Sequence, residues 1–368
     1  MTHAPSLPAA LRLVRVVGTG LLGTSMALAW REQGVRVGLD DQSPSARRLA
    51  EDYGAGVAWS DSLGSPDLVV VAVPPDVTAT VVAQELDRFP EAIVIDVASV
   101  KGAIRRDLDG LGVDMARYIG THPMAGRERG GAMAARVDLF TGRPWVLCPS
   151  ETTPSAVVEW VEGLVRAFGA TVSRMSVDDH DAAVAAVSHV PQVISSAMAA
   201  QLEDVSPPAL SLAGQGVRDV TRIAASDSGL WLQILTQNAP AVKGMVGELI
   251  ADLTALHDAL GHLDEPGSRR LIAEFLARGQ SGVGKLPGKH GLAKRFASLV
   301  VVIDDRPGQL ASLLADVGSL NVNVEDMVLE HSPGAEVGFV ELWVTPDVVH
   351  QLGEDLVERG WRIAGERA

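Results

Sequence analysis

The sequence contains little of several residue types, and each shortage excludes a class of protein. Cys148 is the single cysteine among 368 residues, so the chain forms no internal disulfide, and its apolar neighbours in PWVLCPS predict a buried strand thiol. No apolar run reaches the length of about 18 residues that a membrane-spanning helix needs. The N-terminal segment also lacks the apolar region of a secretory signal. We therefore expect a cytoplasmic protein with no membrane partner.

Basic residues are scarce as well. Lys and Arg number 31 against 46 Asp and Glu, which gives a formal net charge of −15. An acidic surface repels phosphate backbones, so we expect no nucleic-acid partner. The histidine, cysteine and carboxylate residues show no zinc-ligand spacing, and no metal is predicted. The acidic segment DDHD, residues 178–181, is typical instead of a capped helix start.

Hydrophobic patterning divides the chain into regions. In residues 1–178, continuous apolar strands alternate with helical segments, which predicts a parallel sheet covered on both faces in a Rossmann-type doubly wound α/β domain. Residues 179–280 are helical and apolar, so we expect a domain that packs against a second copy in a homodimer. The predicted strands lie in LVRVV, VRVGLDD, DLVVVAVP, AIVIDVAS, RYIGTHPM, RPWVLCPS and ATVSRMSV.

A smaller domain is predicted at the C-terminal end. A linker that contains glycine and proline occupies residues 281–296. In residues 297–368, two helical segments, RPGQLASLLADVGSL and PDVVHQLGEDLVERG, are set among strand-like runs in the order βαββαβ. This order is typical of the ferredoxin-like fold.

The segment GTGLLG matches the G-x-G-x-x-G pattern of a dinucleotide-binding turn. It follows a strand and opens a helix, and Asp40 stands at the end of the next strand, twenty residues after Gly20. In such a turn Gly18 allows the tight bend, Gly20 lets the backbone approach a pyrophosphate, and Gly23 lets the helix pack closely on the strand. The helix N-terminus then faces the phosphates with its positive dipole end.

The cofactor predicted by this motif is NAD. Asp40 is expected to accept hydrogen bonds from the adenosine ribose, and its charge repels the 2′-phosphate of NADP. Arg47 and Arg48 lie in the following helix rather than beside the strand end, and they fit a solvated surface. The predicted cofactor contacts are Gly18, Thr19, Gly20, Leu21, Leu22, Gly23, Asp40, Val73, Pro74 and Ser99.

Two later strand ends carry reactive side chains. DVASVKG and YIGTHPMAG both follow strands, at the carboxyl edge where open α/β sheets bind ligands. We expect Ser99, Lys101 and His122 to face the nicotinamide crevice, and Pro123 restricts His122 to extended backbone. In the helical region, SHVPQ supplies His189, although a lone histidine in an apolar helix is more often a satisfied core residue.

Five segments together resemble the prephenate/arogenate dehydrogenase family of tyrosine biosynthesis over residues 13–279: GTGLLGTSMA, DVASVKG, GTHPMAGRE, VSHVP and RDVTRIAASD. The tail segments DDRPGQLASLL and SLNVNVEDM resemble an ACT domain, an amino-acid-sensing module. The resemblance implies an NAD-dependent oxidative decarboxylation. Prephenate would lose a hydride from C4 and its ring carboxylate as CO₂, leaving the phenol of 4-hydroxyphenylpyruvate. Because formation of the aromatic ring makes this reaction practically irreversible, control by product is expected.

The resemblance also implies roles for site residues. His122 would accept a hydrogen bond from the substrate 4-hydroxyl and take its proton, a task that suits an imidazole. Ser99 would help to hold that hydroxyl and the nicotinamide, and Arg222 would bind a substrate carboxylate. The other substrate contacts that the resemblance implies are Ser188, His189, and two acidic partners, Glu128 and Asp219.

Some positions depart from the family pattern. Gln192 stands where many members carry a second histidine, and Arg127 stands where a smaller residue is common. The choice between prephenate and arogenate therefore stays open. In the tail, the resemblance places Asp305, Gly308 and Asn321 around an effector site for tyrosine or phenylalanine, usually formed between two ACT domains. A domain that only dimerises is the alternative.

Two further functions fit parts of the sequence. A β-hydroxyacid dehydrogenase also joins a Rossmann domain to a helical domain, but it calls for a catalytic lysine in the helical part. Lys243 is the only lysine there, and no motif surrounds it. A non-catalytic regulator that senses a nucleotide and an amino acid would keep the glycine turn and the tail, without needing Ser99, His122 and Arg222 together.

Overall fold

The chain folds into two units. The computed structural model describes residues 11–126, 131–286, 296–331 and 337–367. The internal contacts define one unit within residues 1–205 and 220–249, and a second within residues 206–219 and 250–368.

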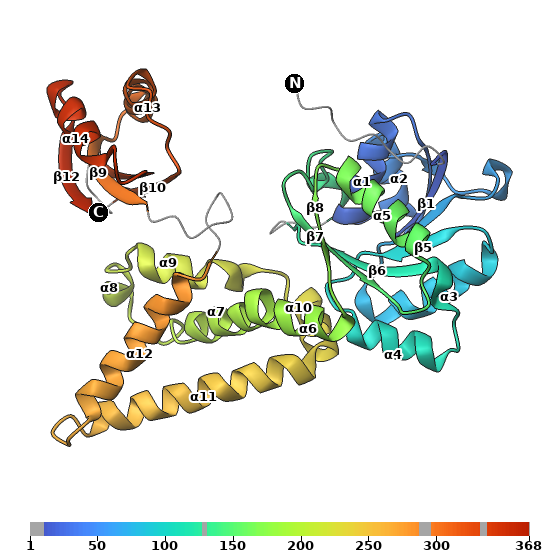
Figure 1. Cartoon of the computed structure of the whole chain (residues 1–368), viewed down its shortest axis with the longest axis horizontal. Helices are drawn as coiled ribbons and strands as arrows, with labels where there is room; N and C mark the ends of the chain where they lie inside the picture. The colour runs from blue at the N-terminus through green and yellow to red at the C-terminus, as the bar shows by residue number, and fades with distance from the viewer. Residues whose placement is uncertain (1–10, 127–130, 287–295, 332–336, 368) are drawn as a thin grey trace. The chain divides into compact units, whose positions relative to one another are not determined.

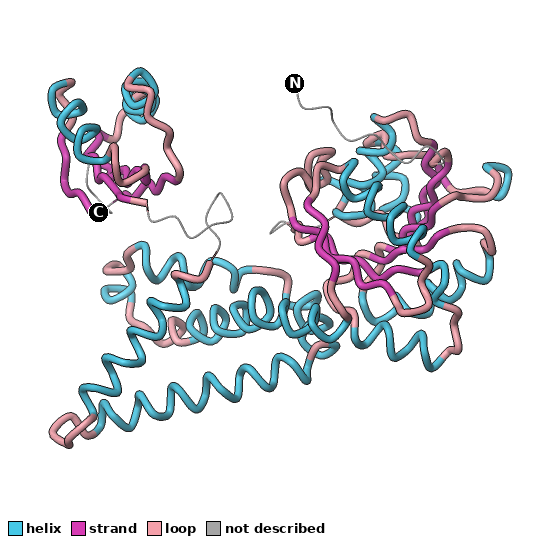
Figure 2. The backbone as a smooth tube through the Cα atoms, in the orientation of Figure 1, coloured by secondary structure: helices cyan, strands magenta, loops and turns pink. Residues whose placement is uncertain are grey.

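The first unit contains an eight-stranded sheet with the strand order β3-β2-β1-β4-β5-β6-β7-β8 (Figures 1 and 2). The strands are β1 (Leu13–Val17), β2 (Arg36–Asp40), β3 (Val57–Ala58), β4 (Leu68–Val71), β5 (Ile93–Asp96), β6 (Tyr118–Pro123), β7 (Pro144–Pro149) and β8 (Thr171–Arg174). The order around β1, with β2 on one side and β4 on the other, confirms the Rossmann-type prediction. Hydrophobic patterning missed β3 because both of its residues are exposed.

The sheet is not parallel throughout, and this corrects the prediction. β6 and β7 pair antiparallel, with His122 opposite Val146. A parallel pair needs a crossover connection, usually a helix. The described part of the connection from β6 to β7 contains only a short 3-10 helix, Ala132–Ala134, so the chain returns in the opposite direction. The predicted burial of Cys148 in β7 is confirmed, and burial raises the pKa of its thiol to about 12.

Helices cover both faces of this sheet (Figures 1 and 2). One face is covered by α1 (Leu21–Glu32), α2 (Pro44–Asp52) and α5 (Ser155–Ala167), and the other by α3 (Pro75–Arg88) and α4 (Gly102–Gly110). In β4, Leu68 and Val70 belong to one buried cluster, whereas Val69 and Val71 belong to the other. A strand between two buried faces needs apolar residues at every position, which explains its continuous apolar run.

The helical region follows β8, and no strand occurs between residues 177 and 283, all of which the structure describes. It begins with one continuous helix formed by α6 (Val177–Val184), a π-helical turn (Ala185–His189) and α7 (Val190–Ala200). Pro191 has no backbone N–H for a regular α-helical bond, which accounts for the wider turn just before it.

By length and composition alone, the continuous helix is apolar enough to span a membrane. Two of its polar residues, however, are buried and bonded to other parts of the fold. His180 is fully buried beside His122, and Asp181 bonds the backbone at the start of α4. Such anchoring is typical of a core helix of a globular domain. Two later helices, α10 (Ser228–Gln237) and α11 (Ala239–Gly261), follow in the chain.

The second unit contains a four-stranded antiparallel sheet with the order β10-β11-β9-β12. Its elements are β9 (Ala297–Asp304), α13 (Gln309–Ser319), β10 (Asp326–His331), β11 (Val337–Val344), α14 (Val349–Glu358) and β12 (Arg362–Arg367). This is the predicted βαββαβ order. The unit also includes α8 (Pro207–Leu210), much of α9 (Gln215–Thr221), and α12 (Ser268–Val283).

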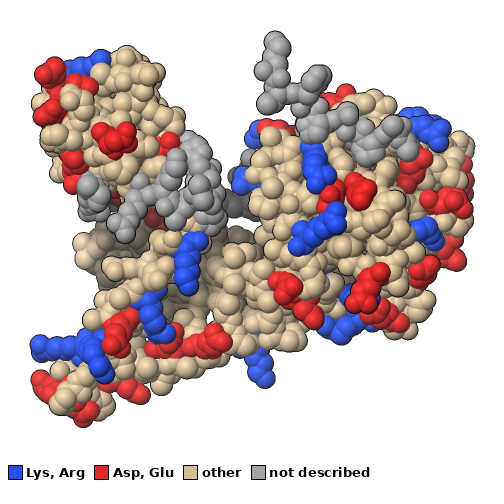
Figure 3. All heavy atoms as spheres, viewed as in Figure 1, with Lys and Arg blue, Asp and Glu red and all other residues tan. Residues whose placement is uncertain are grey.

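Charged side chains are mixed on the surface. On the face shown in Figure 3, Lys and Arg lie among Asp and Glu rather than in a separate patch. Several of them pair one helical turn apart, as Arg47 does with Glu51 at 3.2 Å. Arg47 is thereby engaged on its own helix, α2, but its side chain is only 28% exposed, so it is less solvated than predicted.

Candidate functional site

The three motif glycines meet different surroundings at the start of α1. Gly18 has φ +98°, and a Cβ there would lie 2.3 Å from the carbonyl oxygen of Ala72. A Cβ on Gly23 would lie 2.1 Å from the Gly18 carbonyl oxygen. A Cβ on Gly20 would meet nothing within 4 Å. Packing within the chain thus requires glycine at two positions, while the third leaves open space at the N-terminus of α1, where a pyrophosphate would bind.

Asp40 lies at the end of β2, where a ribose-binding carboxylate is expected. Its Oδ2 accepts from Arg15 Nη2 at 2.6 Å, and its side chain is 41% exposed. Arg15 on β1 is buried and also donates from Nε to Glu85 of α3 at 2.7 Å. Burial alone would lower the pKa of Arg15, but the bonds to Glu85 and Asp40 raise it, so the guanidinium stays charged. Arg15 therefore holds Asp40 in place.

A second aspartate, Asp41, fixes the glycine turn. Its Oδ2 accepts from the backbone N–H of Thr19 at 2.7 Å and from the Thr19 hydroxyl at 2.8 Å. Thr19, a predicted cofactor contact, is buried and held by this carboxylate. Sequence reasoning missed both Arg15 and Asp41. The visible signals were a single arginine within the apolar strand LVRVV and a second acid after Asp40.

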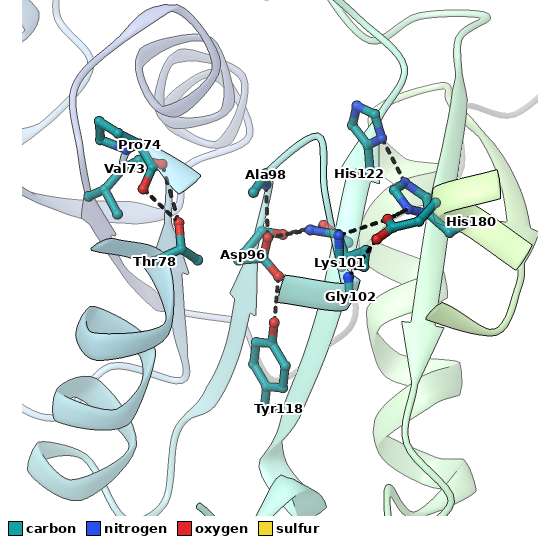
Figure 4. A network of polar contacts seen from close by, with 12 residues as sticks. Val73, Pro74, Thr78, Asp96, Ala98, Lys101, Gly102, Tyr118, His122 and His180 are labelled. Carbon is teal, nitrogen blue, oxygen red and sulfur yellow. Dashed lines mark hydrogen bonds and ion pairs between the residues drawn. The ribbon is translucent and has the colours of Figure 1, made fainter. Parts of the chain in front are cut away.

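The remaining predicted cofactor contacts lie at the same edge of the sheet. Leu21 and Leu22 begin α1 and are partly exposed. Val73 and Pro74 follow β4, and both of their carbonyl oxygens accept from the hydroxyl of Thr78, at 3.4 and 3.0 Å (Figure 4). Thr78 thus fixes the turn from β4 into α3 at this edge.

His122 is the next-to-last residue of β6 and begins a chain of hydrogen bonds (Figure 4). Its Nδ1 lies 2.9 Å from Nε2 of His180 on α6, and Nδ1 of His180 lies 2.8 Å from Oδ1 of Asp181. Asp181 also accepts from the backbone N–H groups of Lys101 at 2.9 Å and Gly102 at 2.8 Å. The carboxylate thus connects α6, the start of α4 and the histidine pair.

The segment DDHD therefore does more than begin a helix. The predicted cap is present, since Ser176 accepts from the backbone N–H of Asp179. The last two residues of the segment, His180 and Asp181, were not predicted as site residues, yet both are buried beside His122. The only sequence signal for them was a His-Asp pair at the start of an apolar helix.

The electrostatics of the site keep His122 neutral. Burial lowers the pKa of His122 well below its ordinary value, and the nearby Lys101, His180 and His189 lower it further. Burial alone would raise the pKa of Asp181, but hydrogen bonds from His180, Lys101 and Gly102 bring it below its ordinary value. The site consequently pairs an uncharged imidazole with a distant carboxylate.

Hydrogen-bond roles along this chain follow from the carboxylate. Asp181 can only accept, so Nδ1 of His180 carries a proton. When each ring holds one proton, Nε2 of His180 accepts from Nδ1 of His122. The Nε2 atom of His122 then presents a lone pair, as a general base requires.

Lys101 does not face the crevice, contrary to the prediction. It is buried, and its Nζ lies 2.5 Å from Oδ1 of Asp96 (Figure 4). The hydroxyl of Tyr118 donates to Oδ2 of the same carboxylate at 2.7 Å. Lys101 thus belongs to a buried network beneath the edge of the sheet. Ser99, in the same loop between β5 and α4, is partly exposed.

The π-helical turn carries Ser188 and His189. Ser188 is partly buried, and His189 is buried with its ring edge-on to Trp231. Nδ1 of His189 lies 3.0 Å from Nδ2 of Asn238, which also donates to the backbone carbonyl of Asp181 at 2.8 Å. Burial lowers the pKa of His189 to about 4. The structure therefore connects His189 to the histidine pair through Asp181.

The remaining predicted substrate contacts are Arg222, Asp219 and Glu128. Arg222 is exposed and begins the 3-10 helix Arg222–Ala225. Asp219 belongs to the second unit, where it accepts from the amide of Gln215 at 2.7 Å. Glu128, like Arg127, lies outside the described residues. In the tail, Asp305 and Gly308 connect β9 to α13, and Asn321, with φ +58°, follows α13.

Two family descriptions match adjoining parts of the chain. Residues 26–174 match the nucleotide-binding domain of prephenate dehydrogenase, and residues 176–274 match the dimerization domain of the same family.

Individual relatives agree with these matches. The chain is 38% identical over 361 residues to the probable prephenate dehydrogenase NovF of Streptomyces niveus, covering 95% of this chain and 99% of the relative. It resembles the crystal structure of Aquifex aeolicus prephenate dehydrogenase with hydroxyphenyl propionate and NAD⁺ (TM-score 0.65, 27% identity, 74% of this chain and 98% of that one). It also resembles Synechocystis arogenate dehydrogenase (TM-score 0.62, 26% identity, 73% and 99%).

Proposed function

The chain belongs to the prephenate dehydrogenase family, and we propose that it converts prephenate to 4-hydroxyphenylpyruvate by oxidative decarboxylation with NAD⁺. The observation that carries this proposal is the hydrogen-bond chain from Asp181 through His180 to His122 at the carboxyl edge of the sheet. A buried chain that ends in a neutral imidazole fits removal of a proton from a substrate hydroxyl.

The residues around the glycine turn fit the cofactor. The open space at Gly20 and the start of α1 would accept the pyrophosphate, and Asp40 would accept from the ribose. When bound there, NAD⁺ supplies the acceptor for the hydride from C4 of the substrate. Asp40 and Asp41 together place two carboxylates beside the ribose site, which favours NAD over NADP.

In this proposal His122 moves the proton of the 4-hydroxyl. As the C4–H bond breaks, Nε2 of His122 takes the hydroxyl proton and the C4–O bond becomes a carbonyl. Loss of CO₂ then leaves the electron pair of the broken carbon–carbon bond in the ring, which becomes aromatic. His122 returns the proton to the oxygen, giving the phenol. Asp181 and His180 stabilise the transient positive charge on His122.

Other residues of this chain would hold the substrate. Ser99 is proposed to orient the 4-hydroxyl beside His122, and Arg222 to bind a carboxylate through its two parallel N–H donors. Ser188 and His189 would contact the substrate from the π-helical turn. Glu128 and Asp219 are proposed as acidic partners that orient Arg222.

The domain limits are part of the proposal. We place the NAD-binding domain at residues 1–178, the helical domain at 179–280, a linker at 281–296 and an ACT domain at 297–368. Exposed apolar side chains on the helical domain, among them Val187, Leu230 and Leu232, support assembly into a homodimer. The ACT domain would bind tyrosine or phenylalanine near Asp305, Gly308 and Asn321 and inhibit the enzyme, in a cytoplasmic setting.

Arogenate is the alternative substrate, favoured by the likeness to Synechocystis arogenate dehydrogenase. A parallel assay decides between them by following NAD⁺ and NADP⁺ reduction with prephenate and with arogenate. We expect turnover with prephenate and NAD⁺. Faster turnover with arogenate would transfer the proposal to the alternative, and absence of turnover with both would overturn it.

A further inference from the structure

Asn238 is a buried polar residue that neither the glycine turn nor the His122 chain uses. It lies between α10 and α11 and is 3% exposed. Its backbone N–H caps the end of α10 by donating to the carbonyl of Ile234. Its side-chain nitrogen lies within hydrogen-bond distance of two groups, the carbonyl oxygen of Asp181 at 2.8 Å and Nδ1 of His189 at 3.0 Å.

These two contacts fix the orientation of the Asn238 amide. The carbonyl oxygen of Asp181 can only accept, so the group facing it must be the NH₂ rather than the amide oxygen. An amide NH₂ has two hydrogens and no available lone pair. It therefore donates to Asp181 with one hydrogen and to Nδ1 of His189 with the other.

The orientation of the amide in turn decides where the proton of His189 lies. Because Nδ1 receives a hydrogen bond, it must present a lone pair, and the single ring proton must be on Nε2. A doubly protonated ring would place two hydrogens against each other at Nδ1. This arrangement thus disfavours the imidazolium as well as the other neutral tautomer.

We propose that Asn238 is a positioning residue that holds His189 as a neutral Nε2–H donor, opposite in role to the acceptor His122. Both roles depend on Asp181, whose carboxylate orients His180 and whose carbonyl orients Asn238. This role rests on the proposed function: Nε2–H of His189 donates a hydrogen bond to a carboxylate or carbonyl oxygen of the substrate. His189 therefore does not act as a second base.

The tautomer can be read directly by NMR on the full-length protein labelled with ¹⁵N-histidine, without any turnover. The resonances are assigned by comparison with His189→Gln. At pH 7 we expect an unprotonated Nδ1 and a protonated Nε2 for His189. A protonated Nδ1, alone or together with Nε2, would overturn the inference. This result does not depend on whether the chain oxidises prephenate.

The consequence for binding can be tested with Asn238→Asp. The titratable groups that interact electrostatically with His189 are Asp181, His180 and His122. A carboxylate at position 238 adds a negative charge beside Nδ1, so it would raise the pKa of His189 and draw a proton to Nδ1. As pH rises past that pKa, Nε2 loses its proton and the donor disappears. For Asn238→Asp we expect the KM for prephenate to rise by about 3–10-fold between pH 6 and 9, which is the change expected for the loss of one hydrogen bond to the substrate.

The matched control is Thr236→Ala, two residues earlier at the C-terminal end of α10, where the hydroxyl donates to carbonyls of its own helix. It should keep the KM profile of the unmodified enzyme. If Asn238→Asp keeps that profile too, while its ¹⁵N spectrum shows the tautomer change, His189 does not donate to the substrate. That outcome would remove the substrate part of the inference and leave the proposed reaction intact.

Discussion

Nδ1 of His122 and Nε2 of His180 lie 2.9 Å apart, although 58 residues separate the two histidines in the chain. One ring lies near the end of β6, in the sheet, and the other in the first turn of α6, in the helical region. Their contact joins the two regions at the point where the chemistry is proposed. This contact predicts that replacement of His180 will affect catalysis.

Replacing His180 should impair catalysis more than binding. In His180→Gln, Nδ1 of His122 loses the partner that fixes its tautomer and the connection to Asp181. We expect kcat to fall by about 10–10³-fold, since a misoriented general base loses most of its contribution. The Kd for NAD⁺, measured by calorimetry, should be unchanged. His262→Gln, which replaces an exposed histidine in the turn after α11, is the control. An unaltered kcat in His180→Gln would reduce the histidine pair to a packing contact.

The pH profile of kcat/KM should reflect the low pKa of His122. A base works in its unprotonated form, and burial holds the pKa of His122 well below 6.5. Activity should therefore stay constant as pH falls from about 8 through 6.5, and decline only further into the acid range. A decline centred at or above the ordinary histidine value of about 6.5 would show that His122 is not the buried neutral base described here.

Acid should also destabilise the fold through His189. Its pKa is about 4 in the folded chain and near 6.5 when unfolded, so the unfolded state binds the additional proton between these values. The stability contributed by the neutral ring is complete above about pH 6.5 and is lost as pH falls toward 4. Over this window, the free energy of unfolding of His189→Gln, measured by chemical denaturation, should fall by about 1–3 kcal/mol less than that of the unmodified protein. His257→Gln, on an exposed residue, should follow the unmodified protein.

The motif glycines offer a matched pair of substitutions. Gly23→Ala places a Cβ 2.1 Å from the Gly18 carbonyl, so it should lower the free energy of unfolding by about 1–3 kcal/mol. Gly20→Ala meets nothing within 4 Å in the chain and should leave stability unchanged while weakening NAD⁺ binding. Thermal melts and calorimetric titration separate the two effects. Undiminished NAD⁺ binding by Gly20→Ala would mean that the pyrophosphate lies elsewhere.

Arg15 should support cofactor binding through Asp40. Arg15→Met alone would leave the buried Glu85 carboxylate without its cation and lower the free energy of unfolding by about 3–5 kcal/mol. The informative variant is therefore Arg15→Met combined with Glu85→Gln. In that double variant Asp40 is no longer held, and the Kd for NAD⁺ should rise by about 3–10-fold. Arg47→Ala, which removes only the pair with Glu51 within α2, should bind NAD⁺ normally. Equal Kd values for the double variant and for Arg47→Ala would show that NAD⁺ binding does not depend on the contact between Arg15 and Asp40.

The sequence was most informative where the chemistry is local. The glycine turn, Asp40 and the strand end before Pro123 are defined by neighbours in the chain, so their places could be predicted from short segments. Each of these features depends on backbone conformation over a few residues. The continuous apolar strands and the βαββαβ order of the tail were predictable for the same reason.

The unpredicted features depend on contacts between distant segments. His180 looked like part of an acidic helix start because a hydrophilic pair does not reveal that tertiary packing will bury it. Lys101 is the exception to this rule: it was expected at the crevice, but it pairs with Asp96, only five residues earlier at the end of β5, beneath the edge of the sheet. The antiparallel direction of β7 depends on a connection whose described residues form no crossover helix, and the apolar residues of the strand alone do not indicate its direction.

The central claim is that His122 removes the proton of the substrate hydroxyl. The most direct measurement is the steady-state kinetics of His122→Asn with prephenate and NAD⁺, because asparagine keeps hydrogen bonding but cannot take a proton at neutral pH. We predict that kcat falls by about 10²–10⁴-fold while the KM values change much less. A kcat close to that of the unmodified enzyme would contradict the claim and return His122 to a structural role at the end of β6.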